Sequence, residues 1–197
     1  ALYHFHVEQI KRSEGRTAVA SAAYRAGEKL HNLWDGETHD YTRKSGVILT
    51  EIFLPEYAPK RLSDRYTLWN EVELVEKRAD AQLAYSFDIA LQNEFSLDEN
   101  IALAREFVQK YFVSDGMIVD LAIHQPDREE GGIPNPHFHV LVPIRPLNKD
   151  GTWGAKQHRI YRLDEYGNRI KKESGGWEFV AVSTTSWGKP ETLDMWR

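Results

Sequence analysis

The 197-residue sequence has no cysteine and no uninterrupted apolar stretch of membrane-spanning length. The lack of cysteine excludes disulfide bonds and any zinc site built from thiolates, and it is typical of a reducing compartment. The lack of a long apolar stretch predicts no membrane insertion, because a transmembrane helix needs about 20 apolar residues. The first residues also lack the charged and apolar regions of a signal peptide. We therefore expect a cytoplasmic protein.

Hydrophobic residues make up 41% of the chain and aromatic residues 12%, which is enough for one globular domain with its own core. The formal net charge of −5 is unevenly distributed, with +1 over residues 1–50, −9 over 51–144 and +3 over 145–197. Contacts with nucleic-acid phosphates are therefore expected from the two ends of the chain. The basic residues expected to make them are Arg12, Arg16, Arg25, Lys29, Lys156, Arg159, Arg162, Lys171 and Lys172.

Two histidines separated by one residue lie in the segment 135–142, whose apolar and β-branched pattern predicts a strand. Because side chains alternate along a strand, His137 and His139 should project from the same face. A second strand is predicted over 117–124, with His124 on its polar face. If the two strands pair, three imidazoles converge, and such a set suits a catalytic transition metal such as Mn, Co, Ni or Zn. An ordinary solvated strand face is the alternative.

The first strand is predicted over residues 2–10, with His4 and His6 on its polar face. A helix follows over 17–30, and its many small residues predict close packing against a sheet. Tyr24 is a large phenol within this helix. It either fills the core with a satisfied hydroxyl group or projects as a functional group, and the helix alone leaves both interpretations open.

The middle of the chain alternates between strand and helix patterns. Strands are predicted over 45–54 and 83–91, and helices over 61–83 and 97–113. Asp88 falls on the polar side of a strand, where aspartate is disfavoured, so it needs a functional reason. Glu71, Glu73 and Glu76 are interpreted as a solvated helix face. The order of elements predicts an α+β fold in which helices pack on one face of a largely antiparallel sheet.

The last part of the chain, 145–197, is predicted to form a C-terminal lobe of the single domain. Turn residues begin it, and a hairpin is expected over 159–172. Its tryptophans alternate with basic residues, a combination that suits single-stranded DNA through stacking and phosphate contact, although the same tryptophans could form the core of the lobe.

Six segments resemble the ordered motifs of a known family. They are Tyr3-His4-Phe5, 15–20, 22–30, 69–73, 135–140 and 145–148. Together they resemble the MobA/MobL, or MobQ-type, relaxases over essentially the whole chain. The resemblance implies a HUH-type relaxase fold. It also implies a DNA endonuclease and strand transferase that nicks an origin of transfer through a 5′-phosphotyrosyl intermediate and so starts conjugative mobilisation.

The resemblance implies a tyrosine nucleophile and a histidine-bound divalent ion (Mn, Mg, Zn, Co or Ni). The matching residues are Tyr24 for the nucleophile and His124, His137 and His139 for the metal. The family pattern expects a glutamate followed later by a proline where this chain has Asp88 and Gln92, so Asp88 is left as an orienting group or a base. His4 and His6 are expected to support the metal ligands or to face DNA.

The resemblance further implies the partners of a bacterial relaxase. These are single-stranded DNA at an origin of transfer, accessory relaxosome proteins and a type IV secretion coupling protein. We also expect the chain to be the N-terminal part of a longer protein. Two other functions stay open. One is a histidine-metal phosphodiesterase that activates water and does not need Tyr24, and the other is a non-catalytic module that binds single-stranded DNA.

Overall fold

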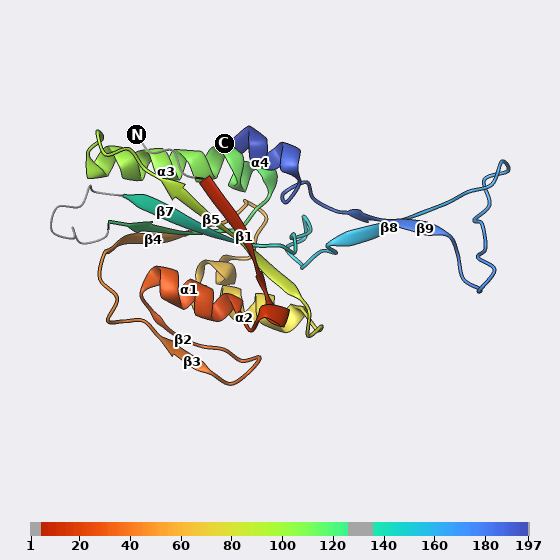
Figure 1. Cartoon of the computed structure of the whole chain (residues 1–197), viewed down its shortest axis with the longest axis horizontal. Helices are drawn as coiled ribbons and strands as arrows, with labels where there is room; N and C mark the ends of the chain where they lie inside the picture. The colour runs from red at the N-terminus through yellow and green to blue at the C-terminus, as the bar shows by residue number, and fades with distance from the viewer. Residues whose placement is uncertain (1–4, 126–135, 197) are drawn as a thin grey trace. The chain divides into compact units, whose positions relative to one another are not determined.

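The computed structural model describes residues 5–125 and 136–196, and its fold is built on a five-stranded sheet. The strand order is β1-β5-β7-β6-β4, and each neighbouring pair is antiparallel (Figure 1). The five strands are β1 (Phe5–Lys11), β4 (Val47–Phe53), β5 (Gln82–Ala90), β6 (Val119–His124) and β7 (His137–Pro143). The predicted pairing of the two histidine strands is confirmed, since β6 and β7 lie side by side.

Three helices accompany the sheet, and each begins at a side-chain cap. They are α1 (Ala18–Ala26), α2 (Arg65–Val75) and α3 (Leu97–Tyr111). The caps are Thr17, Asp64 and Ser96, whose side-chain oxygens accept hydrogen bonds from backbone N–H groups of the first turns. α1 ends at Gly27, whose φ of 66° is in the left-handed region. No helix in the described part of the chain is long and apolar enough to cross a membrane.

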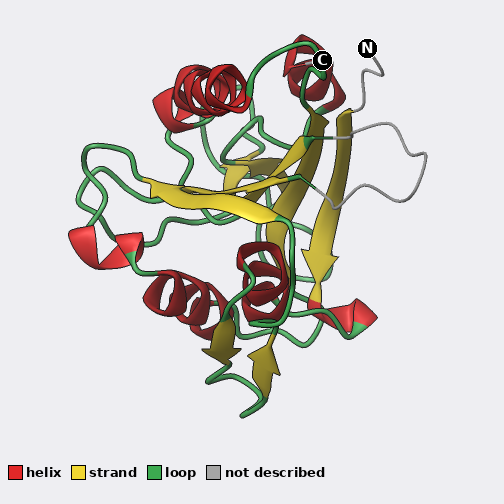
Figure 2. Cartoon of the chain, turned by 90° about the vertical axis from the view of Figure 1, so that its left-hand side faces the viewer, coloured by secondary structure: helices red, strands yellow, loops and turns green. Residues whose placement is uncertain are grey.

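Helices α1 and α2 cover one face of the sheet, and α3 covers the other (Figure 2). On the first face Arg65 of α2 binds Asp120 of β6. On the second face the ring of Phe107 in α3 lies 6.0 Å from the ring of Phe138 in β7, measured between centroids. The α+β class and the antiparallel sheet are therefore confirmed, whereas the prediction that helices pack on one face only is wrong.

The physical reason is that the histidine side of the sheet is apolar along most of its length. Ala84 and Leu141 lie on that side and are buried in the same core cluster as the alanines of α1 and Leu68 and Trp69 of α2. All six residues of β6 are buried as well. Two polar residues of this face that lie away from the histidines, Asp120 and Ser86, are buried and bind Arg65 of α2 and Arg25 of α1. A polar face that the helices cover was therefore interpreted as an open one.

Two predicted helices end earlier than expected. The segment 61–83 forms a short 3₁₀ turn (Lys60–Ser63) followed by α2, and α1 gives way at Gly27 to a small hairpin of β2 (Lys29–His31) and β3 (Thr38–Asp40). Two further 3₁₀ turns are Arg12–Glu14 and Val113–Asp115. Residue 135, the first of the predicted strand 135–142, lies outside the described residues, and so does His4.

The interpretation of the α2 glutamates as a solvated face is wrong for two of the three. Glu73 has no exposed surface and Glu76 is 7% exposed. Glu73 binds Arg12, and Glu76 binds Arg145 at 2.7 Å. The polar stripe of α2 thus turns toward basic groups from other segments of the chain, and a buried charge requires such partners.

The chain divides into two compact units, residues 1–153 and 154–197. The first unit includes 145–153, which the sequence analysis assigned to the C-terminal lobe. The ion pair of Arg145 with Glu76 and the hydrogen bond that Trp153 donates to Glu71 at 3.1 Å hold this segment to α2.

The second unit, described by itself, is a two-stranded ribbon followed by a short helix. Its elements are β8 (Gln157–Tyr161), β9 (Phe179–Ser183) and α4 (Pro190–Trp196). The turn expected near Asp164 is present, because the Asp164 N–H donates to the carbonyl of Asn168 and Leu163 pairs with Arg169. The strand that pairs with β8 is β9, beyond this turn.

Candidate metal centre and active site

Three histidines converge where β6 ends and β7 begins. In the antiparallel register His124 lies opposite His137, and Ala122 lies opposite His139. The ring centroids are 4.5 Å apart for His124 and His139, 4.7 Å for His137 and His139, and 5.6 Å for His124 and His137. One nitrogen from each ring lies within 4.8 Å of the others. This set of donors fits a divalent transition metal with coordination positions left open for a substrate.

The orientation of His124 is set by the first helix. Its Nε2–H donates to the backbone carbonyl of Arg25 at 2.7 Å, because a carbonyl can only accept, and this leaves Nδ1 as the ligand atom. Burial lowers the pKa of His124 to about 4, although the hydrogen bond to Arg25 works in the opposite direction. His124 is therefore neutral near pH 7, which is the form that binds a metal.

The orientation of His139 is set by Asp88, which lies directly opposite it on β5. The Nδ1–H of His139 donates to the Asp88 carboxylate, which leaves Nε2 for a metal. Burial tends to raise the pKa of Asp88, but the hydrogen bond from His139 and the charge of Arg25 outweigh it, so this pKa is lowered. Burial lowers the pKa of His139 despite Asp88. The pair is thus a neutral imidazole bound to a carboxylate.

His6 extends the same row of side chains. It lies opposite Asp88 in the pairing of β1 with β5, so His6, Asp88 and His139 occupy one face of three adjacent strands. His6 is exposed at the end of this row. Its expected role, which is to support the metal ligands or to face DNA, stays a prediction.

Tyr24 projects from α1 and does not fill the core, since 49% of the residue is exposed. Its ring packs edge-on against Tyr41, with centroids 5.3 Å apart and planes at 86°. Lys44 Nζ lies 3.7 Å from the centre of the Tyr24 ring and donates to the Tyr24 backbone carbonyl at 2.9 Å. The phenol is therefore held between an aromatic ring and a cation at the surface.

Arg25, next to Tyr24, turns the opposite way and is buried against the sheet. Its guanidinium donates to the Ser86 hydroxyl and, at 3.3 Å, to the carbonyl of Ser21, and it lies 3.8 Å from Glu8. Burial lowers the pKa of Arg25. The backbone carbonyl of Arg25 holds the last turn of α1 to His124 of the candidate metal centre. The Arg25 side chain holds the same turn to Ser86 on β5.

A groove of about 400 Å³ runs beside Tyr24. Arg16, Ser21, His39 and Tyr41 are among its lining residues. Arg16 pairs with Glu8 at 2.7 Å, and about a third of its side chain is exposed. Of the basic residues predicted at the N-terminal end, Arg16 and Arg25 both line this groove with the tyrosine, and Arg16 is the more exposed of the two side chains.

The other predicted DNA contacts have varied surroundings. Arg12 donates to the Glu73 carboxylate and to the carbonyls of Glu76 and Arg78, so its guanidinium is bound within the protein. Lys29 is largely exposed beside Asp40 at 3.5 Å.

In the second unit the predicted cations lie on or near the ribbon of β8 and β9. Arg159 and Lys172 lie over the ring of Phe179, at 4.5 and 5.2 Å, and Lys171 lies 5.5 Å from the ring centre of Trp177. The remaining predicted cations of this unit are Lys156, before β8, and Arg162, which pairs with Glu178 at 3.2 Å.

The sequence analysis did not single out Lys44, Tyr41 or Ser86. Lys44 and Tyr41 follow a hairpin that was not predicted, and no local periodicity connects them with Tyr24. Ser86 shares the face of Asp88, two residues away on β5, and that alternation was the available signal.

The fold and the site define the class of protein as an α+β domain with a three-histidine centre on an antiparallel sheet and an exposed tyrosine beside it. The model of the MobA/MobL family matches residues 16–197, and the chain belongs to this family. The resemblance found in the sequence is thereby confirmed, together with the HUH-type relaxase fold that it implies.

Named relatives agree with this assignment. The conjugal transfer protein TraA of Agrobacterium fabrum (strain C58) is 38% identical over 185 residues, which is 89% of this chain and 16% of TraA. The mobilization protein MobL of Acidithiobacillus ferridurans is 35% identical over 176 residues, which is 79% of this chain and 46% of MobL. The chain thus spans less than half the length of these two relatives.

A solved structure shows the same fold. It comes from work on the molecular basis of vancomycin resistance transfer in Staphylococcus aureus, and it shares 31% sequence identity with this chain at a TM-score of 0.80. The similarity covers 100% of this chain and 87% of the other.

Proposed function

We propose that this chain is the nicking domain of a conjugative relaxase, which cuts one DNA strand at an origin of transfer and retains its 5′ end on Tyr24. One observation carries the proposal. The exposed Tyr24 lies on a helix whose next residue, Arg25, is hydrogen-bonded through its carbonyl to His124 of the histidine triad. This link ties a candidate nucleophile to a candidate phosphate-activating centre. The names of the relatives, conjugal transfer and mobilization proteins, support the same function.

The residues that would hold the ion are His124, His137 and His139, with Asp88 behind His139. A divalent ion bound there would polarise a non-bridging phosphate oxygen and orient the scissile bond. Asp88 has a lowered pKa and already accepts a hydrogen bond from His139, so we assign it the orienting role and not that of the base.

In the proposed reaction the Tyr24 hydroxyl oxygen attacks phosphorus, and the bond from phosphorus to the 3′ oxygen of the preceding nucleotide breaks. The proton leaves the phenol, and the departing 3′ oxygen takes up a proton to become a free hydroxyl group. A phenol has a reference pKa of about 10, so its negative form needs stabilisation near neutral pH. Lys44 is placed to provide it, because its ammonium group lies over the Tyr24 ring. The phosphotyrosyl bond conserves energy for religation.

DNA on either side of the cut would follow basic groups of both units. We assign the groove beside Tyr24, with Arg16, to the strand next to the scissile phosphate, and the exposed Lys29 at the start of β2 to a further phosphate contact. The cations of the second unit would hold another segment of the DNA. Arg12 is assigned to the protein interior, and Arg25, which lines the groove with most of its side chain buried, is assigned to positioning the helix that carries Tyr24. In a bacterial cell this activity would operate in the cytoplasm with accessory relaxosome proteins and a type IV secretion coupling protein.

The test is to incubate the chain and Mn²⁺ with a pool of labelled single-stranded oligonucleotides that cover a cognate origin of transfer. We expect a labelled protein band that survives denaturant and contains phosphotyrosine. The matched control is Tyr24→Phe, which removes only the hydroxyl group and should abolish the band while leaving metal content unchanged.

The same experiment separates the two other functions. Cleavage that persists in Tyr24→Phe without a protein-bound product would identify a metal phosphodiesterase that uses water. Binding without cleavage by the unmodified chain in Mn²⁺ would identify a non-catalytic module. An unchanged adduct in Tyr24→Phe would move the nucleophile to another tyrosine, with Tyr41 the nearest candidate.

A further inference from the structure

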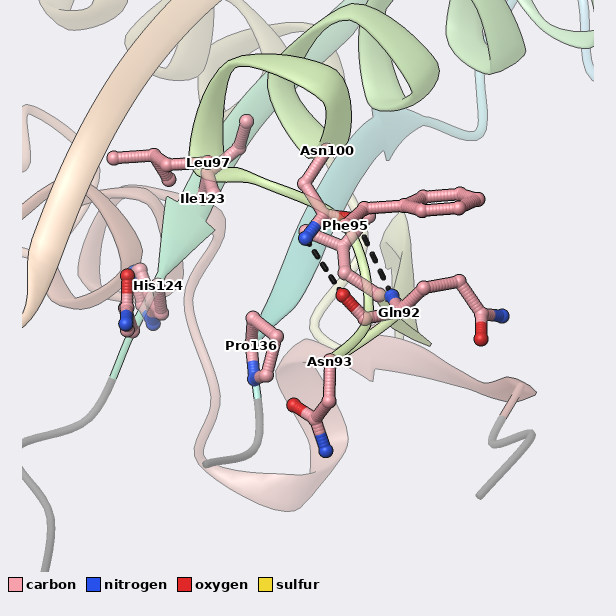
Figure 3. Close-up of a pocket in the computed structure, with 10 residues that line it drawn as sticks. Gln92, Asn93, Phe95, Leu97, Asn100, Ile123, His124 and Pro136 are labelled. Carbon is pink, nitrogen blue, oxygen red and sulfur yellow. Dashed lines mark hydrogen bonds between the residues drawn. The ribbon is translucent and has the colours of Figure 1, made fainter. Parts of the chain in front are cut away.

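A second, smaller cleft lies beside His124 of the histidine triad, where β5 and β6 end and β7 begins (Figure 3). Its volume is about 160 Å³, well below the roughly 300 Å³ at which pockets for drug-sized ligands begin. It therefore admits one small planar group and not a whole ligand. His124 bounds the cleft on one side and Phe95 is among its lining residues, so a group seated in it lies next to the candidate metal centre.

The wall of this cleft is fixed in place by buried hydrogen bonds. The Asn100 side chain, 3% exposed on α3, accepts from the Gln92 N–H at 3.3 Å and donates to the Gln92 carbonyl at 2.8 Å. The Leu91 N–H donates to the Pro136 carbonyl at 2.8 Å. Figure 3 shows these two Asn100 bonds beside Phe95, with Pro136 between them and His124. The segment after β5 is thus tied to α3 and to the start of β7, and the cleft is preformed.

The lining combines an exposed aromatic ring with free amides. Phe95 is 47% exposed, so its ring is accessible to a ligand. The structure records no hydrogen bond of the Gln92 or Asn93 side-chain amides with the described residues, since Gln92 uses only its backbone. Apart from His124, no side chain in the described lining is titratable.

An aromatic face together with free amide donors and acceptors is the chemistry that recognises a nucleobase. The ring stacks on the base, and the amides bond to its edge. A phosphate would require cations, and the lining residues that the structure describes include no lysine or arginine. We propose that this cleft holds one unpaired base of the DNA strand, that of a nucleotide adjacent to the phosphate at the histidine triad. The proposal rests on the proposed function, and it names the part of the substrate that this side of the site recognises.

The test measures binding and not cleavage. Proteins in a Tyr24→Phe background, loaded with Mn²⁺, are titrated with a short single-stranded DNA of mixed sequence and with a strand of equal length that lacks bases. Phe95→Ala should weaken binding of the base-bearing strand at least about fivefold, the lower end for loss of one stacked base, and leave binding of the abasic strand unchanged. Tyr66→Ala, which removes an exposed aromatic side chain outside the cleft, is the matched control and should change neither affinity.

A second measurement locates the base. A strand in which thymines are replaced by 5-iodouracil is irradiated on the protein, and the crosslinked peptide is identified by mass spectrometry. A crosslink to Phe95 that is only weakly suppressed by the abasic strand supports the proposed cleft. Gln92→Ala keeps the backbone hydrogen bonds to Asn100 and should alter which bases the protein prefers.

Equal affinities of Phe95→Ala and its parent for the base-bearing strand, or crosslinks confined to other residues, would overturn the base cleft. Neither result depends on DNA cleavage or on the Tyr24 adduct. Failure of the unmodified chain to form an adduct would instead count against the proposed function, so the two failures are distinguishable.

Discussion

The Oε1 atom of Glu73 accepts a hydrogen bond from the backbone N–H of Ala18 at 2.6 Å, which joins the last turn of α2 to the first turn of α1. Its other carboxylate oxygen binds Arg12 at 2.8 Å. A negative charge at a helix N-terminus is favourable, and this one has no exposed surface. The helix that carries Tyr24 is thus held at its start by Glu73 and near its end by the bond between Arg25 and His124.

Replacing Glu73 by glutamine should destabilise the protein. The change leaves the Arg12 guanidinium buried without its counter-charge, and breaking a buried ion pair costs about 3 kcal/mol or more in free energy of unfolding. Urea unfolding followed by circular dichroism measures this, with Asp80→Asn as control because it removes an exposed partner of Arg78 and should change little. An unchanged unfolding free energy for Glu73→Gln would show that the buried pair contributes nothing to stability.

Asp88→Asn should lower metal affinity by about 10-fold to 100-fold, the usual effect of losing a carboxylate behind a ligating histidine. The asparagine keeps an acceptor oxygen for the His139 N–H but loses the negative charge. Isothermal titration with Mn²⁺ and Co²⁺ measures the affinity. Glu51→Gln, on the edge strand β4 and paired with Arg105, is the control that should bind as the parent does. Parent-like affinity of Asp88→Asn would mean that Asp88 has no part in the metal site.

His137→Ala should remove bound metal, because two imidazoles and an open face bind a divalent ion far more weakly than three. Elemental analysis of protein purified in excess Co²⁺ provides the measurement. His158→Ala, an exposed histidine on β8, controls for nonspecific binding and should retain the parent metal content. Full occupancy in His137→Ala would require a different ligand set.

Much of this site could be predicted from alternation alone. Because side chains alternate along a strand, His137 and His139 had to share a face, and the pairing of β6 with β7 brought His124 to them. Asp88 was found from its unfavourable position in a strand, and the register then placed it opposite His139. These inferences needed only local periodicity and one correct strand pair.

What could not be predicted depends on contacts between distant segments. Lys44 reaches Tyr24 only because the hairpin of β2 and β3 folds back along α1, and that hairpin has three-residue strands with little pattern. Glu73 looked like a surface glutamate because helical periodicity does not reveal that Arg12 approaches the polar stripe of α2. Strand periodicity likewise does not reveal that α1 and α2 pack on the histidine face of the sheet, so the burial of that face was missed.

The affinity for single-stranded DNA should fall steeply with salt despite the net charge of −5, because bound phosphates release counterions. Removing two phosphate contacts with Lys171→Ala and Lys172→Ala should reduce the slope of log K against log salt by about 1.4. Fluorescence anisotropy over a salt series measures the slope, and Arg78→Ala, an exposed cation paired with Asp80, is the control. A slope equal to that of the parent would show that these two lysines make no backbone contact.

The last prediction concerns Lys44, whose ammonium group lies 3.7 Å from the centre of the Tyr24 ring. Burial and the charge of Arg25 lower the pKa of Lys44, so it is partly desolvated, and a partly desolvated charge stabilises a nearby anion more strongly than a solvated one. Lys44→Met keeps the length of the side chain and removes the charge. If Lys44 stabilises the phenolate that forms during attack, the rate of adduct formation should fall about 100-fold, the lower end of the loss for one donor that stabilises a transition-state charge.

Metal content should stay close to the parent value, because Lys44 is not one of the three histidines that could hold the ion. Lys44 does contact Tyr24 in the groove, so the rate is compared at saturating DNA, where a change in affinity has no effect. Lys29→Met, at the exposed end of β2, removes an equivalent charge away from the phenol and should leave the single-turnover rate unchanged. The decisive measurement is the single-turnover rate of adduct formation at saturating DNA, which separates chemistry from binding. A parent-like rate in Lys44→Met would show that the cation serves only to hold the Tyr24 backbone, and the negative charge of the phenolate would then have to be stabilised at the metal centre alone.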